Sequence, residues 1–91
     1  MESESLFKPP ETRKLKAGRV RLSPGEEVGE HVTEKREESI VVLKGDAAVL
    51  VDGKEHVISQ GNAFYISEGK RHNVKNNGKK ELEYVYVVSL L

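Results

Sequence analysis

The most constraining feature of this sequence is the even spacing of its glycines. From residue 45 onward, glycine stands at positions 45, 53, 61, 69 and 78, at intervals of eight, eight, eight and nine residues. Short apolar segments lie between these glycines, and no segment has a sustained helical periodicity. Short strands separated by turns at this spacing are typical of sandwiches and barrels. The pattern therefore predicts an all-β fold.

Apolar runs and turn residues place the individual strands. Asp52-Gly53 separates two apolar segments and is a strong hairpin signal, because this pair tolerates the positive φ angles of a tight turn. Earlier in the chain Val20 and Leu22 alternate with arginines, so the two apolar side chains are expected to face a core and the arginines water. The expected strands are residues 16–22, 40–43, 47–51, 55–58, 63–66, 72–75 and 82–91.

The composition narrows the class of protein. A chain of 91 residues makes one small domain, only modestly stable as a monomer. Its 15 Lys and Arg residues balance 15 Asp and Glu residues, which argues against binding nucleic acid or an anionic membrane through bulk charge. The acidic N-terminus is unlike a signal peptide and no long apolar run is present, so a cytoplasmic location is expected. A charged fraction of 33%, rich in Lys and Glu, is typical of thermostable proteins.

The two ends of the chain carry further expectations. Residues 1–14 are polar and contain Pro9-Pro10, and they are interpreted either as an N-terminal arm or as a disordered terminus, with residues 15–91 as the barrel domain. The segment 82–91 has apolar residues on both faces of a regular strand. Both faces are therefore expected to be buried against other parts of the protein. A homodimer is therefore expected, and sedimentation as a monomer would contradict it.

Polar side chains gather just ahead of the apolar segment 40–43. His31 and Thr33 are two residues apart, so on a strand they point to the same face. Glu37 and Glu38 are adjacent, so only one of them can join that face. With no cysteine in the chain, any metal must be held by His, Asp, Glu or other oxygen donors. Imidazole and carboxylate on one sheet face are a start for a metal site, although a histidine on a strand face is more often a hydrogen-bonded or solvated polar residue.

Two stretches together resemble the paired motifs of the cupin superfamily. In the first, Gly25 is followed by His31 after five residues, then by Thr33 at a second histidine position, by Glu38 and by Gly45. In the second, Gly61 is followed by Ser67 at a proline position, and Gly69, His72 and Asn76 are all in register. The match covers residues 25–76 and departs from the pattern at Thr33 and Ser67.

The resemblance to a small single-domain cupin (a monocupin) implies an antiparallel jelly-roll β-barrel, the double-stranded β-helix, with the motif side chains in its mouth. Carried over by position, it implies that His31, Glu38 and His72 bind a divalent metal ion: Fe, Mn, Zn or Ni. Thr33 replaces the fourth ligand and is expected to bond a water or a substrate instead. Glu37 is the alternative carboxylate, but parity excludes it from the face of His31 on a regular strand.

Several functions stay open at this point. Two imidazoles and a carboxylate form the triad of non-haem iron oxygenases, so one hypothesis is a metal-dependent enzyme, dioxygenase-like or isomerase-like, acting on a small oxygenated or sugar-like molecule. The second is a non-catalytic module that binds or senses a small molecule, with or without metal. The third is a scaffold with a vestigial site. Other polar residues are expected to be structural or solvated: His56 at the surface or the edge of the core, Asn76 in a turn, and the basic residues of 70–80 in a solvated loop. The alternative for the basic residues is that they attract an anionic substrate toward the barrel mouth near His72.

Overall fold

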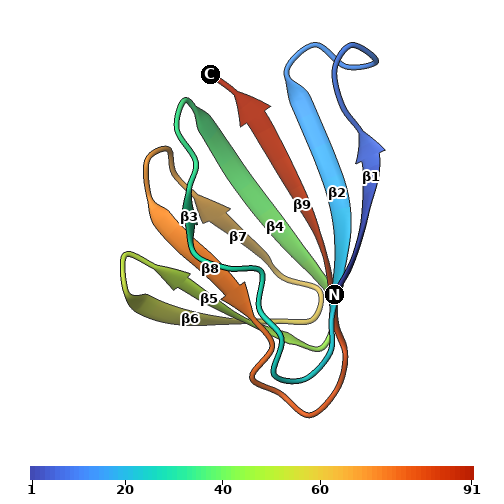
Figure 1. Cartoon of the computed structure of the whole chain (residues 1–91), viewed down its shortest axis with the longest axis vertical. Coiled ribbons are helices and arrows are strands. Elements are labelled where there is room, and N and C mark those ends of the chain that lie inside the picture. The colour runs from blue at the N-terminus through green and yellow to red at the C-terminus, as the bar shows by residue number, and fades with distance from the viewer.

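Nine strands and no helix make up the structure, a computed structural model that describes residues 1–91 (Figure 1). They form a five-stranded sheet in the order β1-β2-β9-β4-β7 and a four-stranded sheet in the order β3-β8-β5-β6. The strands are β1 (Glu2–Phe7), β2 (Leu15–Leu22), β3 (His31–Val32), β4 (Arg36–Lys44), β5 (Asp46–Val51), β6 (Lys54–Ser59), β7 (Ala63–Ile66), β8 (Arg71–Lys75) and β9 (Leu82–Leu90).

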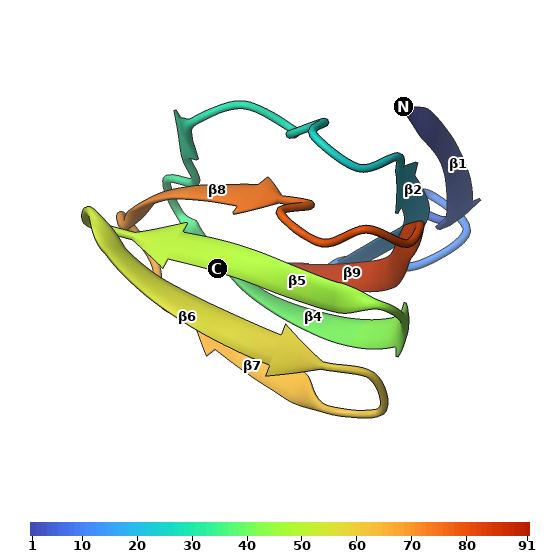
Figure 2. The ribbon, with the colours of Figure 1, turned by 90° about the horizontal axis from the view of Figure 1, so that it is seen from below.

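Every strand pairing is antiparallel, and the two sheets face each other as the walls of a jelly-roll barrel (Figure 2). The fold predicted from the sequence is therefore confirmed. Because the chain has no helix, it has none that could cross a membrane.

Glycines make the turns between the strands. Asp52 and Gly53 have φ angles of 49° and 81° and join β5 to β6, which confirms the predicted hairpin. Gly45 ends β4 with a φ of 77°, and a Cβ added there would lie 2.7 Å from the carbonyl oxygen of Glu81. Both its backbone conformation and its surroundings therefore require glycine at position 45.

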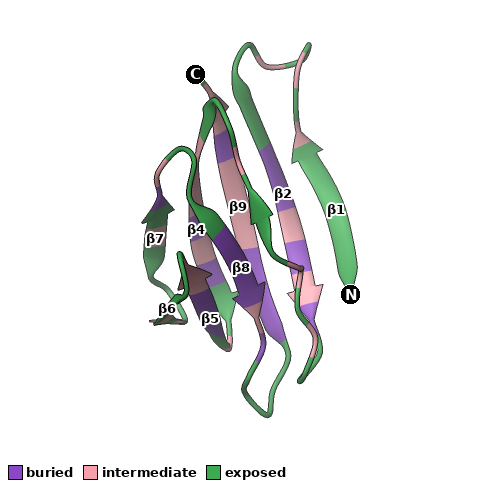
Figure 3. Ribbon diagram, turned by 60° about the vertical axis from the view of Figure 1, so that its left-hand side comes forward, coloured by how far each residue is buried: buried purple, intermediate pink, exposed green.

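The apolar core fills one end of the barrel (Figure 3). Val20 and Leu22 are buried in it, as the alternation in the sequence predicts. Arg21 points to the other side of β2 and pairs with Glu83 at 2.8 Å. Burial of each large core side chain contributes about 1.5–3 kcal/mol. The residues of the core are Val20, Leu22, Ile40, Val42, Ala47, Val49, Ile66, Val74, Leu82 and Tyr84.

The first residues of the chain form an edge strand. Glu2–Phe7 is β1, which pairs with β2, and residues 8–14 make the connection. Two ion pairs link the strands on their outer face, from Arg19 to Glu4 and from Arg21 to Glu2, each at 3.4 Å. The sequence left an arm and a disordered terminus open; in the structure Glu2–Phe7 forms the outermost strand of the five-stranded sheet, and the division into an arm and a barrel domain stays a prediction.

The last strand lies in the middle of the five-stranded sheet. β9 pairs with β2 on one side and with β4 on the other. Its inward residues Leu82, Tyr84 and Val88 are buried, whereas Val85 and Val87 on the outer face are half-buried. The homodimer inferred from these two apolar faces stays a prediction, as do thermostability and the cytoplasmic location.

Candidate metal centre

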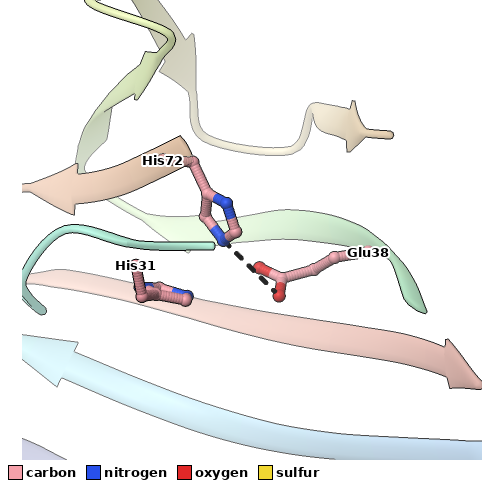
Figure 4. Close-up of side chains that lie close together, drawn as sticks. All are labelled: His31, Glu38 and His72. Carbon is pink, nitrogen blue, oxygen red and sulfur yellow. Dashed lines mark ion pairs between the residues drawn. The ribbon is translucent and has the colours of Figure 1, made fainter. Parts of the chain in front are cut away.

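Strands from both sheets bring His31, His72 and Glu38 together (Figure 4). His31 on β3 and His72 on β8 are direct register partners, and their ring centroids lie 4.1 Å apart in an edge-to-face arrangement. Glu38 lies on β4 in the opposite sheet, and its carboxylate points toward the histidines. The candidate ligand atoms of the three side chains all lie within 4.8 Å of one another. The structure therefore unites the three residues that the sequence singled out.

Backbone carbonyls orient both imidazole rings. Nδ1 of His31 lies 3.0 Å from the carbonyl oxygen of Gly29, and Nδ1 of His72 lies 3.0 Å from that of Lys70. A carbonyl oxygen can only accept, so each neutral ring keeps its proton on Nδ1 and has its lone pair on Nε2. Metal-ligating histidines are oriented in this way, with one nitrogen fixed by a backbone or carboxylate oxygen.

Nε2 of His72 is a buried acceptor without a partner. The His72 side chain is 0% exposed, and its Nε2 forms no hydrogen bond. Oε1 of Glu38 lies 3.9 Å away, beyond hydrogen-bonding distance. An unsatisfied buried polar atom of this kind costs about 1–3 kcal/mol. A divalent ion held by both Nε2 atoms and the carboxylate would satisfy it, and imidazole and carboxylate are suitable ligands for Fe, Mn, Zn and Ni. The residues present therefore fit a metal ion.

The carboxylate of Glu38 lies in a largely dry environment, with its side chain 11% exposed. Burial raises the pKa of Glu38, while the neighbouring His72 and His31 act to lower it. Burial also raises the pKa of Tyr84 above its ordinary range, with Glu38 adding to the effect. At neutral pH the Tyr84 hydroxyl is consequently protonated, so it acts as a hydrogen-bond donor and not as a base.

The three residues lie beside a cavity of about 300 Å³ between the two sheets. Its volume is at the lower end of the range for small-molecule sites. Tyr86 lies over Gly18, where a Cβ would come within 2.7 Å of Cε1 of the tyrosine, so glycine makes room for the ring. The apolar part of the wall consists of Met1, Val20, Val28, Val74, Tyr84, Tyr86 and Val88.

Thr33 and Glu37 take different positions relative to this cavity. Thr33 lines it together with His31, although β3 ends one residue earlier, at Val32. The carbonyl oxygen of Thr33 accepts a hydrogen bond of 3.0 Å from the N–H of Gly69, which ties the two motif stretches together. Glu37 points to the other side of the sheet, where its carboxylate accepts a hydrogen bond of 2.8 Å from the Tyr65 hydroxyl. Parity thus selected the glutamate that lies beside the two histidines.

The remaining polar residues have the structural roles expected of them. The side chain of Asn76 donates to the carbonyl oxygens of Leu22 at 2.9 Å and Lys80 at 2.8 Å, and it accepts from the N–H of Gly78 at 3.0 Å. It therefore organises the loop before β9. His56 is half-buried and lies against Phe64, with ring centroids 4.9 Å apart.

The basic residues within 70–80 lie outside the cavity, and three of them form ion pairs on the surface. Lys70 pairs with Asp52 at 3.4 Å, Arg71 with Glu30 at 3.0 Å and Lys75 with Glu27 at 3.6 Å.

Two basic residues of the cavity wall are absent from the sequence-based site. Lys16 on β2 and Arg36 on β4 both line the cavity. Parity gives only a partial signal for each of them. Arg36 is two residues before Glu38, and Lys16 is four residues before the buried Val20, so each shares the inward face of its strand.

A jelly-roll barrel with inward histidines and a glutamate defines a cupin-type domain. A family model described as "Cupin domain" matches residues 18–88, so the chain belongs to the cupin family. None of the functionally curated proteins matches the sequence.

Solved structures show the same fold. The cupin domain of Cnp3 from Schizosaccharomyces pombe superposes with a TM-score of 0.89 at 24% identity, over 98% of this chain and 64% of that one. A predicted oxalate decarboxylase from Thermotoga maritima has a TM-score of 0.79 at 32% identity, over 84% of this chain and 66% of that one. The cupin domain of an XRE-family transcriptional regulator from Enterobacter cloacae has a TM-score of 0.89 at 20% identity, over 99% and 96%. The chain thus spans slightly less than two thirds of the first two proteins.

Proposed function

We propose that this cupin is a metal-dependent enzyme acting on a small oxygenated molecule, with His31, Glu38 and His72 as the metal ligands. The observation that carries the proposal is the buried, unpartnered Nε2 of His72, aimed at a carboxylate that is itself short of a counter-charge. A divalent ion at this place supplies Lewis-acid polarisation of an oxygen-containing ligand, and two-His-one-carboxylate sites leave open positions for such chemistry.

The chain's own residues prepare the site for this task. The carbonyls of Gly29 and Lys70 hold the imidazoles in one tautomer and one orientation. The valines and tyrosines of the cavity exclude water from one side of the ligand, which strengthens the polar interactions made there. Thr33 and Tyr84 offer hydroxyl groups at the cavity wall for hydrogen bonds to the ligand. These contacts fix a substrate beside the three ligand residues.

A second candidate function is binding or sensing without turnover. One observation favours it: Glu38 is the only carboxylate of the cavity wall, and Tyr84 stays protonated, so no further group is placed to act as a general base. Substrate screening separates the two candidates, because a sensor binds its ligand without releasing a product. The relative described as a predicted oxalate decarboxylase supports the enzymatic candidate by analogy.

Elemental analysis of protein purified without a His tag or chelator tests the metal site. Wild type is expected to hold close to one divalent ion per chain, and His31→Ala and His72→Ala to hold almost none. His56→Ala is the matched control, because it removes the third histidine of the chain and leaves the cluster intact. Wild type that takes up no metal, even after anaerobic addition of Fe(II) or Mn(II), would rule out the metalloenzyme.

A further inference from the structure

The cavity has a second polar region, formed by Lys16 and Arg36. β9 lies between their two strands, and its Val88 is the register partner of Lys16 on one side and of Glu38 on the other. Lys16 and Glu38 therefore lie in one row across the sheet, and Arg36 lies one inward-facing position beyond that row. Strands are about 4.8 Å apart, so the backbones of β2 and β4 are separated by roughly 10 Å. Both long side chains can reach one ligand placed between them.

The two basic side chains of the cavity wall are exposed, and no neighbouring carboxylate neutralises their charges. Neither Lys16 nor Arg36 forms an ion pair, although Arg19 and Arg21 on the opposite face of β2 both do. Glu38 is the one carboxylate in the cavity wall, and it faces the histidines. The side chains of the wall thus carry two positive charges and one negative charge, and a divalent ion beside Glu38 would raise the excess further. Such a cavity favours a negatively charged ligand.

We propose that the cavity binds a small organic acid, with a carboxylate of the acid held by Arg36 and Lys16 and its other oxygen atoms directed toward His31, Glu38 and His72. The part of the proposal that concerns the metal rests on the function proposed above. The planar guanidinium of Arg36 matches a carboxylate with two parallel hydrogen bonds, and Lys16 adds a point charge. The cavity volume of about 300 Å³ limits the ligand to a short acid.

Calorimetric titration of Zn(II)-loaded and metal-free protein with malate and malonate tests the proposal. Wild type is expected to bind both acids, and Arg36→Gln and Lys16→Gln each to weaken binding by about 10- to 100-fold, the usual loss for a hydrogen bond between charged groups. Lys14→Gln is the matched control, because Lys14 is exposed like Lys16 and Arg36 and lies near the start of β2, but is not part of the cavity wall. Zinc content is expected to be unchanged in all three variants. The uncharged diamide of malate is expected to bind weakly and equally to wild type and Arg36→Gln.

The outcomes distinguish this proposal from the metal site. Stoichiometric zinc with equal affinity for the acids in wild type, Arg36→Gln and Lys16→Gln would overturn carboxylate recognition and leave the metal site standing. If wild type takes up no zinc, the metal site is wrong, and the metal-free titration decides: binding of the acids that depends on Arg36 supports the cation pair, and no binding overturns it. Inorganic phosphate bound as tightly as malate, with the same dependence on Arg36, would overturn the assignment to carboxylic acids.

Discussion

The two ends of the barrel are built from the same strands but differ in chemistry. At one end the inward residues of β2, β9 and β4 are Leu22, Leu82 and Val42, all fully buried. At the other end the same inward faces of β2 and β4 carry Lys16 and Glu38, which line the cavity. The change takes place within six residues on β2 and four on β4. One end therefore supplies the stability of the fold, and the other is free to hold polar groups.

The polar end of the barrel lowers the stability of the metal-free protein. Glu38 is a mostly buried carboxylate without a basic partner in contact, and Nε2 of His72 is buried without a hydrogen bond. Buried charges and polar atoms destabilise a fold unless they are paired. The apolar end must offset this loss of stability. Functional sites commonly lower the stability of a fold in this way.

The largest expected effect is at the apolar end. Ile40→Ala removes most of a fully buried side chain and should lower the free energy of unfolding by about 2–5 kcal/mol, because the core cannot collapse completely into the cavity. Thermal unfolding followed by circular dichroism measures the change. Val57→Ala, at a position that is 63% exposed, is the control and should have a small effect. An Ile40→Ala protein as stable as Val57→Ala would show that the apolar end does not dominate stability.

The second prediction is that the metal-free protein is stabilised by Glu38→Gln. Burial raises the pKa of Glu38, so the folded state binds the proton more tightly than the unfolded chain does. The stabilising contribution of the Glu38 carboxyl group is therefore lost as the pH rises through its pKa in the folded state. At neutral pH the ionised carboxylate lowers the free energy of unfolding. Glutamine removes the charge, and its amide N–H can donate to Nε2 of His72.

Two readouts test Glu38→Gln together. In the presence of a chelator at pH 7, its melting temperature should exceed that of wild type, and the difference should shrink as the pH falls through the raised pKa of Glu38 and disappear below the ordinary glutamate pKa. Its metal content should be close to zero. A variant that is less stable than metal-free wild type at pH 7 would mean that the carboxylate is not a cost and that the two ends do not differ as described.

Sequence patterns predicted most of the barrel because its turns and alternation are local. Asp52-Gly53 requires a hairpin, and the alternation around Val20 requires one inward face. The edge strand Glu2–Phe7 could not be predicted in this way, because it buries almost no side chain and is held by backbone pairing and ion pairs to β2. Its polar sequence carries no periodic apolar signal.

The candidate site also has a part that the sequence predicted and a part that it did not. Motif spacing identified His31, Glu38 and His72, and the structure brings them together. Lys16 and Arg36 were missed, because they reach the cavity only through the register of three strands that are distant in sequence. Charged residues on a strand are most often solvated, so parity alone did not distinguish these two from neighbours that face water.

The smallest expected effect concerns a second carboxylate, which lies at the apolar end but on the outer face of the sheet. Glu83 is 8% exposed, and its carboxylate accepts a hydrogen bond of 2.8 Å from Nε of Arg21. The hydrogen bond from Arg21 lowers the pKa of Glu83, against the opposing effect of burial. Two carboxylates of low exposure in one domain thus have pKa values shifted in opposite directions, because only one of them contacts an arginine.

Glu83→Gln should therefore affect stability with the sign opposite to that of Glu38→Gln. Stability from a carboxylate with a lowered pKa is present above its ordinary value of 4.5 and is lost as the pH falls through the folded pKa. The variant should be slightly less stable than wild type at pH 7 and should lose less stability between neutral and acidic pH. Its metal content should be that of wild type. Urea unfolding of both variants across this pH range measures how the free energy of unfolding of each variant, relative to wild type, changes with pH. Changes of the same sign would contradict the conclusion that the buried carboxylate destabilises one end of the barrel and the paired carboxylate stabilises the other.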